Sequence, residues 1–211
     1  MEKVFRKKRS ADVNWEEEYR TAKKRLWRSK PHTFSRLARQ RVPVGKVMDI
    51  GSGEGYDCLY FARAGYQVTA LDISSTTIKT LLSVAREHHL MIRGHVQDIK
   101  KFPIRSSYDI FVSYGVLQFL GRKFKRYLLG LKKKTVPGGV HAFYIFGNKG
   151  DFYSLAKHRF HFPSEKELRS LYADWKILKF KKKNTRLLIR GDHGETLYNS
   201  MFKILVQKPK I

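Results

Sequence analysis

The segment that decides the fold is Lys46-Val-Met-Asp-Ile-Gly51-Ser-Gly-Glu-Gly55-Tyr-Asp57. Residues 46–51 form a short, mostly apolar run, which predicts a buried strand. Glycines follow at positions 51, 53 and 55, where they allow a tight turn and let a ligand approach the backbone. Residues 56–64 are rich in Leu, Tyr, Phe and Ala and predict a short helix. A strand, a glycine-rich loop and a helix in this order are typical of a ligand-binding α/β sheet.

The alternation of strands and helices continues along the chain. Asn14 and Ser164, each followed by Glu three positions later, mark the starts of two helices. Helices are expected at 14–27, from 74 or 75 onward, at 122–134 and from 164 onward, and further strands at 67–72, 91–97, 108–113, 140–146, 175–180 and 196–207, with a turn at 137–139. This order predicts an α/β fold with a doubly wound, mostly parallel seven-stranded sheet and an antiparallel pair at one end. We assign residues 1–44 to an N-terminal basic segment and helix, and 45–211 to the α/β domain.

Charge is the most unusual feature of the composition. The 211 residues include 44 Lys and Arg but only 18 Asp and Glu, a formal net charge of +26. Residues 47–120 carry 7 of each kind, so the excess lies in the two flanks. A protein this basic attracts polyanions, and a nucleic acid is therefore an alternative partner. A solvated helix face and a lysine-protected edge strand explain the same charges without a partner.

Cysteine content and hydropathy indicate the compartment. The single cysteine, Cys58, excludes an intrachain disulfide and a thiol-rich zinc site. No apolar run approaches the length of a membrane span, about 20 residues, and the polar N-terminal region does not resemble a secretory signal. We therefore expect a cytoplasmic protein with no membrane contact and no bound metal; the sequence predicts no oligomeric state.

The carboxylates around the glycine loop indicate which nucleoside it binds. Asp72 ends the second predicted strand 19 residues after Gly53, close to the spacing at which an acidic residue reaches ribose hydroxyls. Asp49, Glu54 and Asp57 would repel a pyrophosphate. The same charges attract the sulfonium and ammonium groups of S-adenosylmethionine, which makes this cofactor the prediction.

Asp98 and Ile99 follow the third predicted strand, where the carboxylate can accept a hydrogen bond from an adenine amino group and the isoleucine can pack on the ring. The run Asp49–Gly55, Asp72 and the turn at 97–99 resemble the motifs of class I methyltransferases. More specifically, DIGSGEGYDCLYFARAGYQVTALDIS and FHFPSEKELRSLYADWKILKF resemble the tellurite-resistance methyltransferases of the TehB type, over about residues 45–207. The resemblance implies the Rossmann-like class I methyltransferase fold and methyl transfer from S-adenosylmethionine. The predicted cofactor-binding residues are Asp49, Gly51, Ser52, Gly53, Gly55, Asp72, Ile73, Asp98, Ile99 and Ser113.

The basic loop before the last strand is where the family pattern places a His-Arg pair and a further Arg. Arg190 matches this pattern and His193 lies in the same loop, so we assign both to catalysis. The expected acceptor is a small, anionic or polarizable molecule. In-line methyl transfer needs little beyond correct positioning and exclusion of water, so a general base is optional.

Other functions stay open at this point. The basic flanks suit an RNA or protein methyltransferase, and a non-catalytic binding module could keep the same fold. Cytosine C5 methylation is disfavoured because it needs a nucleophilic cysteine, and the single cysteine, Cys58, falls in the predicted helix beside the glycine loop. Exocyclic amine methylation is disfavoured because the chain has Ser113-Tyr-Gly-Val116 where such enzymes carry an Asn/Asp-Pro-Pro-aromatic turn. The stripe of Trp15 and Tyr19 favours packing, with a lid over the cofactor as the alternative.

Overall fold

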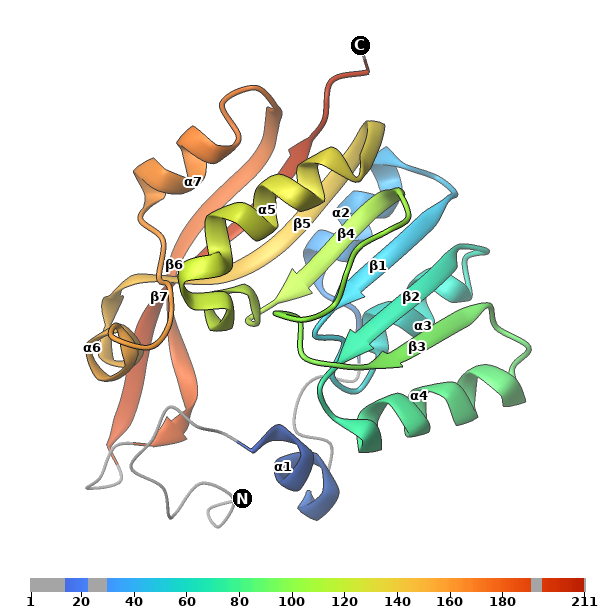
Figure 1. Cartoon of the computed structure of the whole chain (residues 1–211), viewed down its shortest axis with the longest axis horizontal. Helices are drawn as coiled ribbons and strands as arrows, with labels where there is room; N and C mark the ends of the chain where they lie inside the picture. Colours follow the sequence, from blue (N-terminus) through green and yellow to red (C-terminus); the bar gives the residue numbers. More distant parts are fainter. Residues whose placement is uncertain (1–13, 23–29, 191–194, 211) are drawn as a thin grey trace.

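The structure is a computed structural model that describes residues 14–22, 30–190 and 195–210. Its centre is a seven-stranded sheet with the strand order β3-β2-β1-β4-β5-β7-β6 (Figure 1). The strands are β1 (Lys46–Ile50), β2 (Gln67–Asp72), β3 (Ile92–Val96), β4 (Tyr108–Tyr114), β5 (Thr135–Gly150), β6 (Lys176–Arg190) and β7 (Thr196–Gln207). β1 to β5 run parallel, and β7 lies antiparallel between β5 and β6. The predicted seven-stranded, mostly parallel sheet is confirmed.

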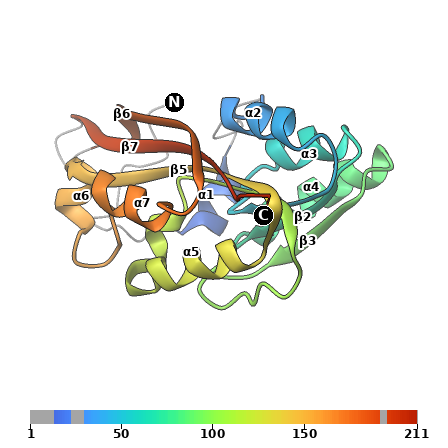
Figure 2. The ribbon, with the colours of Figure 1, turned by 90° about the horizontal axis from the view of Figure 1, so that it is seen from above.

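Helices cover the sheet on both faces (Figure 2). They are α1 (Trp15–Thr21), α2 (Thr33–Arg41), α3 (Tyr56–Ala62), α4 (Ser75–Glu87), the 3-10 helix η1 (Leu117–Lys123), α5 (Phe124–Lys133), α6 (Asp151–Ala156) and α7 (Glu165–Leu171). One buried cluster joins α2, α3 and α4 to the sheet, and another joins η1, α5 and α7 to its other face. In the described part of the chain, no helix combines the length and apolarity that a bilayer crossing demands.

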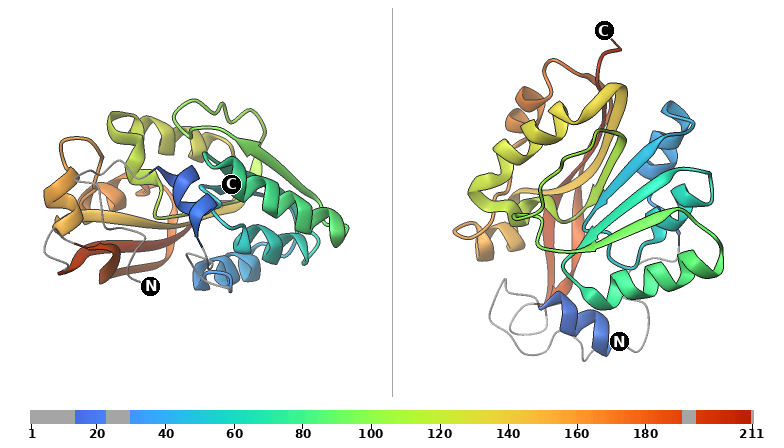
Figure 3. Two further views of the ribbon diagram at one scale, coloured as in Figure 1. Left: turned by 90° about the horizontal axis from the view of Figure 1, so that it is seen from below. Right: turned by 45° about the vertical axis from the view of Figure 1, so that its right-hand side comes forward.

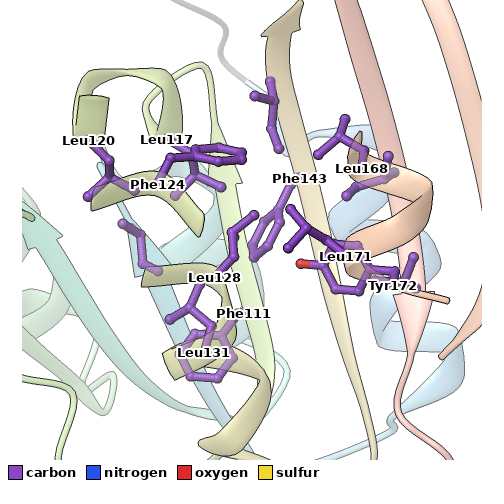
Figure 4. Close-up of a cluster of buried hydrophobic side chains, with 14 of the residues drawn as sticks. Phe111, Leu117, Leu120, Phe124, Leu128, Leu131, Phe143, Leu168, Leu171 and Tyr172 are labelled. Carbon is purple, nitrogen blue, oxygen red and sulfur yellow. The ribbon is translucent and has the colours of Figure 1, made fainter. Parts of the chain in front are cut away.

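The strands are apolar on both sides because both faces of the sheet are covered. In β1, Val47 packs with the α2–α4 cluster while Met48 and Ile50 pack with the α5–α7 cluster. Continuous burial of this kind is typical of parallel strands in α/β sheets. Figure 4 shows the second cluster, where Phe111 and Phe143 of the sheet meet side chains from η1, α5 and α7.

Local signals predicted several element boundaries. The Asn14 side chain accepts a hydrogen bond from the backbone N–H of Glu17, and the Ser164 hydroxyl accepts one from that of Glu167, so both predicted helix starts are confirmed. The last strand, residues 196–207, has the predicted bounds.

Other elements differ from the prediction. α1 ends at Thr21 instead of continuing to residue 27, and residues 23–29 lie outside the described residues. The expected turn at 137–139 lies inside β5, because Gly138 takes a positive φ of 78° there and the pairing with β4 shifts register instead of breaking. α2 and α6 were not predicted. The proposed boundary between residues 44 and 45 stays a prediction.

Candidate cofactor site

The glycine loop lies at the edge of the sheet where the parallel strands end. Gly51, Gly53 and Gly55 have φ values of +73°, +51° and +76°, in the left-handed region that favours glycine. The N–H of Gly51 donates to the Leu71 carbonyl at 2.7 Å, which ties the loop to the end of β2. A Cβ atom on Gly51 would lie 2.3 Å from Cγ2 of Val116, so the segment after β4 closes the other side.

Asp72, the last residue of β2, connects this loop to the start of α4. One carboxylate oxygen accepts the N–H of Gly53 at 2.8 Å, and the other accepts that of Ser74 at 2.9 Å. Burial raises the pKa of Asp72, although the backbone hydrogen bonds oppose the increase. A carboxylate has about four lone-pair positions, so Asp72 keeps acceptor capacity for two hydroxyl groups. Ile73 beside it is 55% exposed, and its side chain is accessible to a ligand.

Two of the carboxylates expected to face a cation have partners inside the protein. Asp49 is buried and accepts a hydrogen bond from the Cys58 thiol at 3.2 Å. Burial raises the pKa of Asp49 well above its usual value, and the neighbouring charge of Asp57 adds to the increase. Asp57 itself accepts the backbone N–H of His32 at 2.8 Å. Asp49 and Asp57 therefore contribute less to the attraction of a cationic ligand than the sequence analysis predicted.

α1 lies across the end of the sheet, over the glycine loop (Figure 3). The hydroxyl of Tyr19 is 2.7 Å from the position that a Cβ on Gly53 would take. On one side, the Glu16 carboxylate accepts hydrogen bonds from the Thr76 hydroxyl at 2.7 Å and its backbone N–H at 3.3 Å. Hydrogen bonds from Thr76 and Ser74 lower the pKa of Glu16 to about 2. α1 therefore packs against α4, as the stripe of Trp15 and Tyr19 predicted, whereas a role as a lid over the cofactor stays a prediction.

Trp15, the neighbour of Glu16 in the first turn of α1, reaches η1, where its ring meets that of Phe119 edge to face with centroids 6.5 Å apart. α1 therefore touches the α4 side and the η1 side of the sheet at once. This bridge crosses the point where the strand order reverses, next to β1, which is where doubly wound sheets bind ligands.

The remaining predicted cofactor residues have different surroundings. Ser113 is buried at the end of β4, and its hydroxyl donates to the Ile50 carbonyl at 2.8 Å, so it joins β4 to β1. The Ser52 hydroxyl is buried and has no hydrogen-bond partner among the described residues. Asp98 is half-buried and accepts the Lys100 N–H at 2.8 Å. Ile99 is only 7% exposed and packs mainly in the protein core, which limits its contact with an adenine ring.

The two residues assigned to catalysis are less fully described. Arg190 is the last residue of β6, and its backbone pairs with Thr196 of β7. That position lies at the same edge of the sheet as the glycine loop, because β6 runs parallel to β5. The Arg190 side chain is not described, and His193 lies outside the described residues. Both assignments stay predictions.

A polar cluster around His32 was missed by the sequence analysis. Nδ1 of His32 lies 2.6 Å from the Asp57 carboxylate, and the imidazole stacks on Tyr114 with ring centroids 3.8 Å apart. The Tyr114 hydroxyl in turn lies 2.6 Å from that of Ser35. Burial raises the pKa of Tyr114 well above its usual value. The partners are 25 and 79 residues apart in sequence, so no local spacing predicts these contacts.

A hollow of about 680 Å³ lies beside the site, lined mainly by α3 and α4. Tyr19 and Glu54 border it, whereas Tyr56, Tyr60 and Thr80 form its walls. Thr76 and Thr77 at the start of α4 also line it, whereas Asp72 and Ser113 do not. In residues 14–22, 30–190 and 195–210, no group of three His, Cys, Asp or Glu side chains is arranged to hold a metal ion.

A glycine loop after β1, an acidic residue ending β2 and a serine ending β4, in this strand order, define the fold of the class I methyltransferases. The chain matches the family model of "Tellurite resistance protein TehB" over residues 14–202, and it belongs to this family. The predicted family is confirmed.

Individual relatives agree with this membership. The chain is 28% identical over 164 residues to "Probable S-adenosyl-L-methionine-dependent methyltransferase TehB" of Haemophilus influenzae, a match that covers 77% of this chain and 57% of the relative. It is also 28% identical over 179 residues to "Hemagglutinin 1" of Eikenella corrodens, covering 84% of this chain and 59% of the relative. The chain thus spans less than two thirds of the length of these relatives.

Solved structures share the fold. The crystal structure of TehB from Haemophilus influenzae superposes with a TM-score of 0.72 and 24% identity, over 92% of this chain and 65% of that one. The N-methyltransferase NodS from Bradyrhizobium japonicum, solved with S-adenosyl-l-homocysteine, superposes with a TM-score of 0.65 and 15% identity, over 93% of this chain and all of that one.

Proposed function

We propose that this chain is an S-adenosylmethionine-dependent methyltransferase that acts on a small, anionic or polarizable acceptor. The observation that carries the cofactor assignment is the Asp72 carboxylate, which is held by the Gly53 and Ser74 N–H groups beside three left-handed glycines. The names of the Haemophilus relative and of the NodS complex support the same cofactor.

The residues present fit this cofactor. Asp72 has acceptor positions left for the ribose hydroxyls, and the buried Ser52 hydroxyl is available for a further polar group. The three left-handed glycines shape the tight turn beside which the cofactor would lie. When bound, S-adenosylmethionine supplies a methyl group activated by a sulfonium. α1 excludes water from above, which favours displacement by the acceptor over hydrolysis.

Charge supports the acceptor class. Residues 121–211 carry 22 Lys and Arg against 6 Asp and Glu, and they include the strands β5, β6 and β7 on the η1 side of the glycine loop. Arg190 ends β6 at the edge of the sheet where the cofactor residues lie. An anionic molecule is attracted to this side, and a polarizable nucleophile reacts without a general base once it is positioned. Arg190 and His193 are the residues that we propose for acceptor binding.

Calorimetric titration with S-adenosylmethionine tests the cofactor assignment. Asp72→Ala removes the proposed ribose contacts, and we expect binding to weaken at least about 10-fold, since even one hydrogen bond to a charged group contributes roughly 1.5–3 kcal/mol. Asp109→Ala is the matched control, because Asp109 also accepts a backbone N–H, that of Lys46, but at the opposite edge of the sheet. Unchanged affinity in Asp72→Ala, or tight binding of NADH or ATP instead, contradicts the proposal.

Turnover tests the acceptor class. The protein is incubated with S-adenosylmethionine and a panel of oxyanions, including tellurite, and thiols, and the release of S-adenosylhomocysteine is measured. We expect release with at least one anionic or polarizable acceptor, and a loss of that activity in Arg190→Ala. Cofactor binding without release on any acceptor of the panel identifies a binding module instead.

A further inference from the structure

β6 forms one edge of the sheet and is unusually basic. Its 15 residues include seven Lys and Arg and no Asp or Glu. Edge strands often carry a lysine that blocks pairing with other chains. That explanation accounts for one or two charges on β6. It does not account for Lys203 on β7, because β7 is not an edge strand: it pairs with β5 on one side and with β6 on the other.

The pairing of β6 with β7 shows which way three of these lysines point. Lys179, Lys181 and Lys183 pair with Leu205, Lys203 and Met201, respectively. Residues directly opposite each other in an antiparallel pair share a face. Leu205 and Met201 belong to the buried cluster on the α2 side of the sheet, so the three lysines point to that side.

Lys203 belongs to the same group although it lies on an interior strand. Its Nζ sits 4.4 Å from the centre of the Tyr144 ring, and Tyr144 also packs on the α2 side. Lys179, Lys181, Lys183 and Lys203 therefore form one cluster, here called the lysine row.

No described helix covers β6 on this side. α2 packs against β5 and β7, and α7 lies on the opposite face, where the Arg169 guanidinium is 4.2 Å from the Phe180 ring (Figure 2). Lys181 and Lys183 are exposed. Among the described residues, neither they nor Lys179 form an ion pair with a carboxylate. Lys179, Lys181 and Lys183 of the lysine row thus form an open positive surface with no carboxylate partner among the described residues.

We propose that the lysine row binds the phosphodiester backbone of a single-stranded nucleic acid, a function beyond methyl transfer to a small acceptor. Alternate residues of a strand lie about 6.6 Å apart, twice the rise per residue, which is comparable to the separation of successive phosphates in an extended strand. The described side chains of β6 include no large exposed hydrophobic residue that could insert into a membrane. The chemistry is that of a sequence-independent backbone contact.

The direction of β6 connects this surface to the candidate cofactor site. β6 runs parallel to β5 and ends at Arg190, at the edge of the sheet where the glycine loop lies. A strand of nucleic acid that follows the lysine row from Lys179 to Lys183 is therefore led toward that edge.

Fluorescence anisotropy with a labelled 20-nucleotide single-stranded RNA tests the proposal on the full chain. The variant Lys179→Gln/Lys181→Gln/Lys183→Gln neutralises three charges. Because log K falls with log salt by about 0.7 per phosphate contact on single strands, the slope should decrease by about 2, and affinity at 0.1 M salt should fall about 100-fold. The matched control is Lys125→Gln/Arg126→Gln/Lys133→Gln, which removes three exposed charges from α5 on the opposite face.

Loss of binding in the β6 variant with retention in the α5 variant supports the lysine row. Equal losses in the two variants show attraction by net charge alone and overturn it. So does the absence of RNA binding by the unmodified chain at 0.1 M salt, or binding to vesicles of phosphatidylserine and phosphatidylcholine but not to RNA. Circular dichroism and calorimetry with S-adenosylmethionine check that the β6 variant is folded, and they report on the cofactor site independently.

Discussion

Substitution of Gly51 by alanine tests the geometry of the glycine loop most directly. Two costs add at this position. An L-residue at φ +73° is in the left-handed region, which costs roughly 1–2 kcal/mol. The new Cβ would also lie 2.3 Å from Cγ2 of Val116, and overpacking of this kind costs about 1–3 kcal/mol. We expect Gly51→Ala to lower the free energy of unfolding by about 2–5 kcal/mol, a large part of the stability of an ordinary domain.

Gly65→Ala separates the two costs. Gly65 has a similar φ of +85°, but a Cβ there has no neighbour within 4 Å. The free energy of unfolding of Gly65→Ala should therefore fall only by the conformational cost, about 1–2 kcal/mol. The difference between the two variants measures the contact with Val116.

Urea unfolding of both variants gives these free energies, provided that the m-value stays that of the unmodified chain. The double variant Gly51→Ala/Val116→Ala removes the clashing methyl groups, so it should be less destabilised than the sum of its two single variants. If Gly51→Ala and Gly65→Ala differ by less than about 0.5 kcal/mol, or if the double variant is simply additive, the proposed packing of the loop against Val116 is wrong.

Three further predictions concern polar groups around the loop. The pKa of Glu16 is lowered to about 2, so its hydrogen bonds to Thr76 stabilise the fold fully above pH 4.5, the ordinary pKa of a glutamate, and this stabilisation is lost as pH falls toward 2. Glu16→Gln should therefore flatten the profile of thermal unfolding against pH in this range. His32→Ala deprives Asp57 of one partner and should cost about 1–3 kcal/mol in urea unfolding, and a loss no larger than that of an exposed surface histidine argues against the contact. Because the pKa of Asp49 is raised, the ionisation of this one carboxyl group opposes folding as pH rises above 3.8. Asp49→Asn should therefore stabilise the chain by about 1–3 kcal/mol at pH 7 but not at pH 3, and equal effects at both pH values refute this.

The fold could be predicted because its signals are local. The apolar run of β1, the glycines after it and the caps at Asn14 and Ser164 each act within a few residues, and the structure confirms them. α2 carried a comparable signal, since Phe34, Leu37 and Ala38 follow helical spacing, but the sequence analysis did not use it.

The environment of the site was harder to predict because it depends on tertiary contacts. The charge of Asp49 was expected to face a ligand, whereas the fold buries it against Cys58. Ile99 was expected on an adenine ring, whereas it packs mainly in the core. His32 and Asp57 meet only because α2 returns to the start of α3. Sequence spacing indicates which residues end a strand, but not how much water or which partner each side chain retains.

The position of α1 has a consequence for turnover. A nucleoside that enters or leaves the strand ends must displace Tyr19 from its place above Gly53. Such an opening breaks the bonds of Glu16 to Thr76 on one side and the contact of Trp15 with Phe119 on the other. If the chain binds the cofactor as proposed, this seven-residue helix would have to move for the cofactor to exchange, and a variant that loosens either anchorage should shorten the cofactor's residence time.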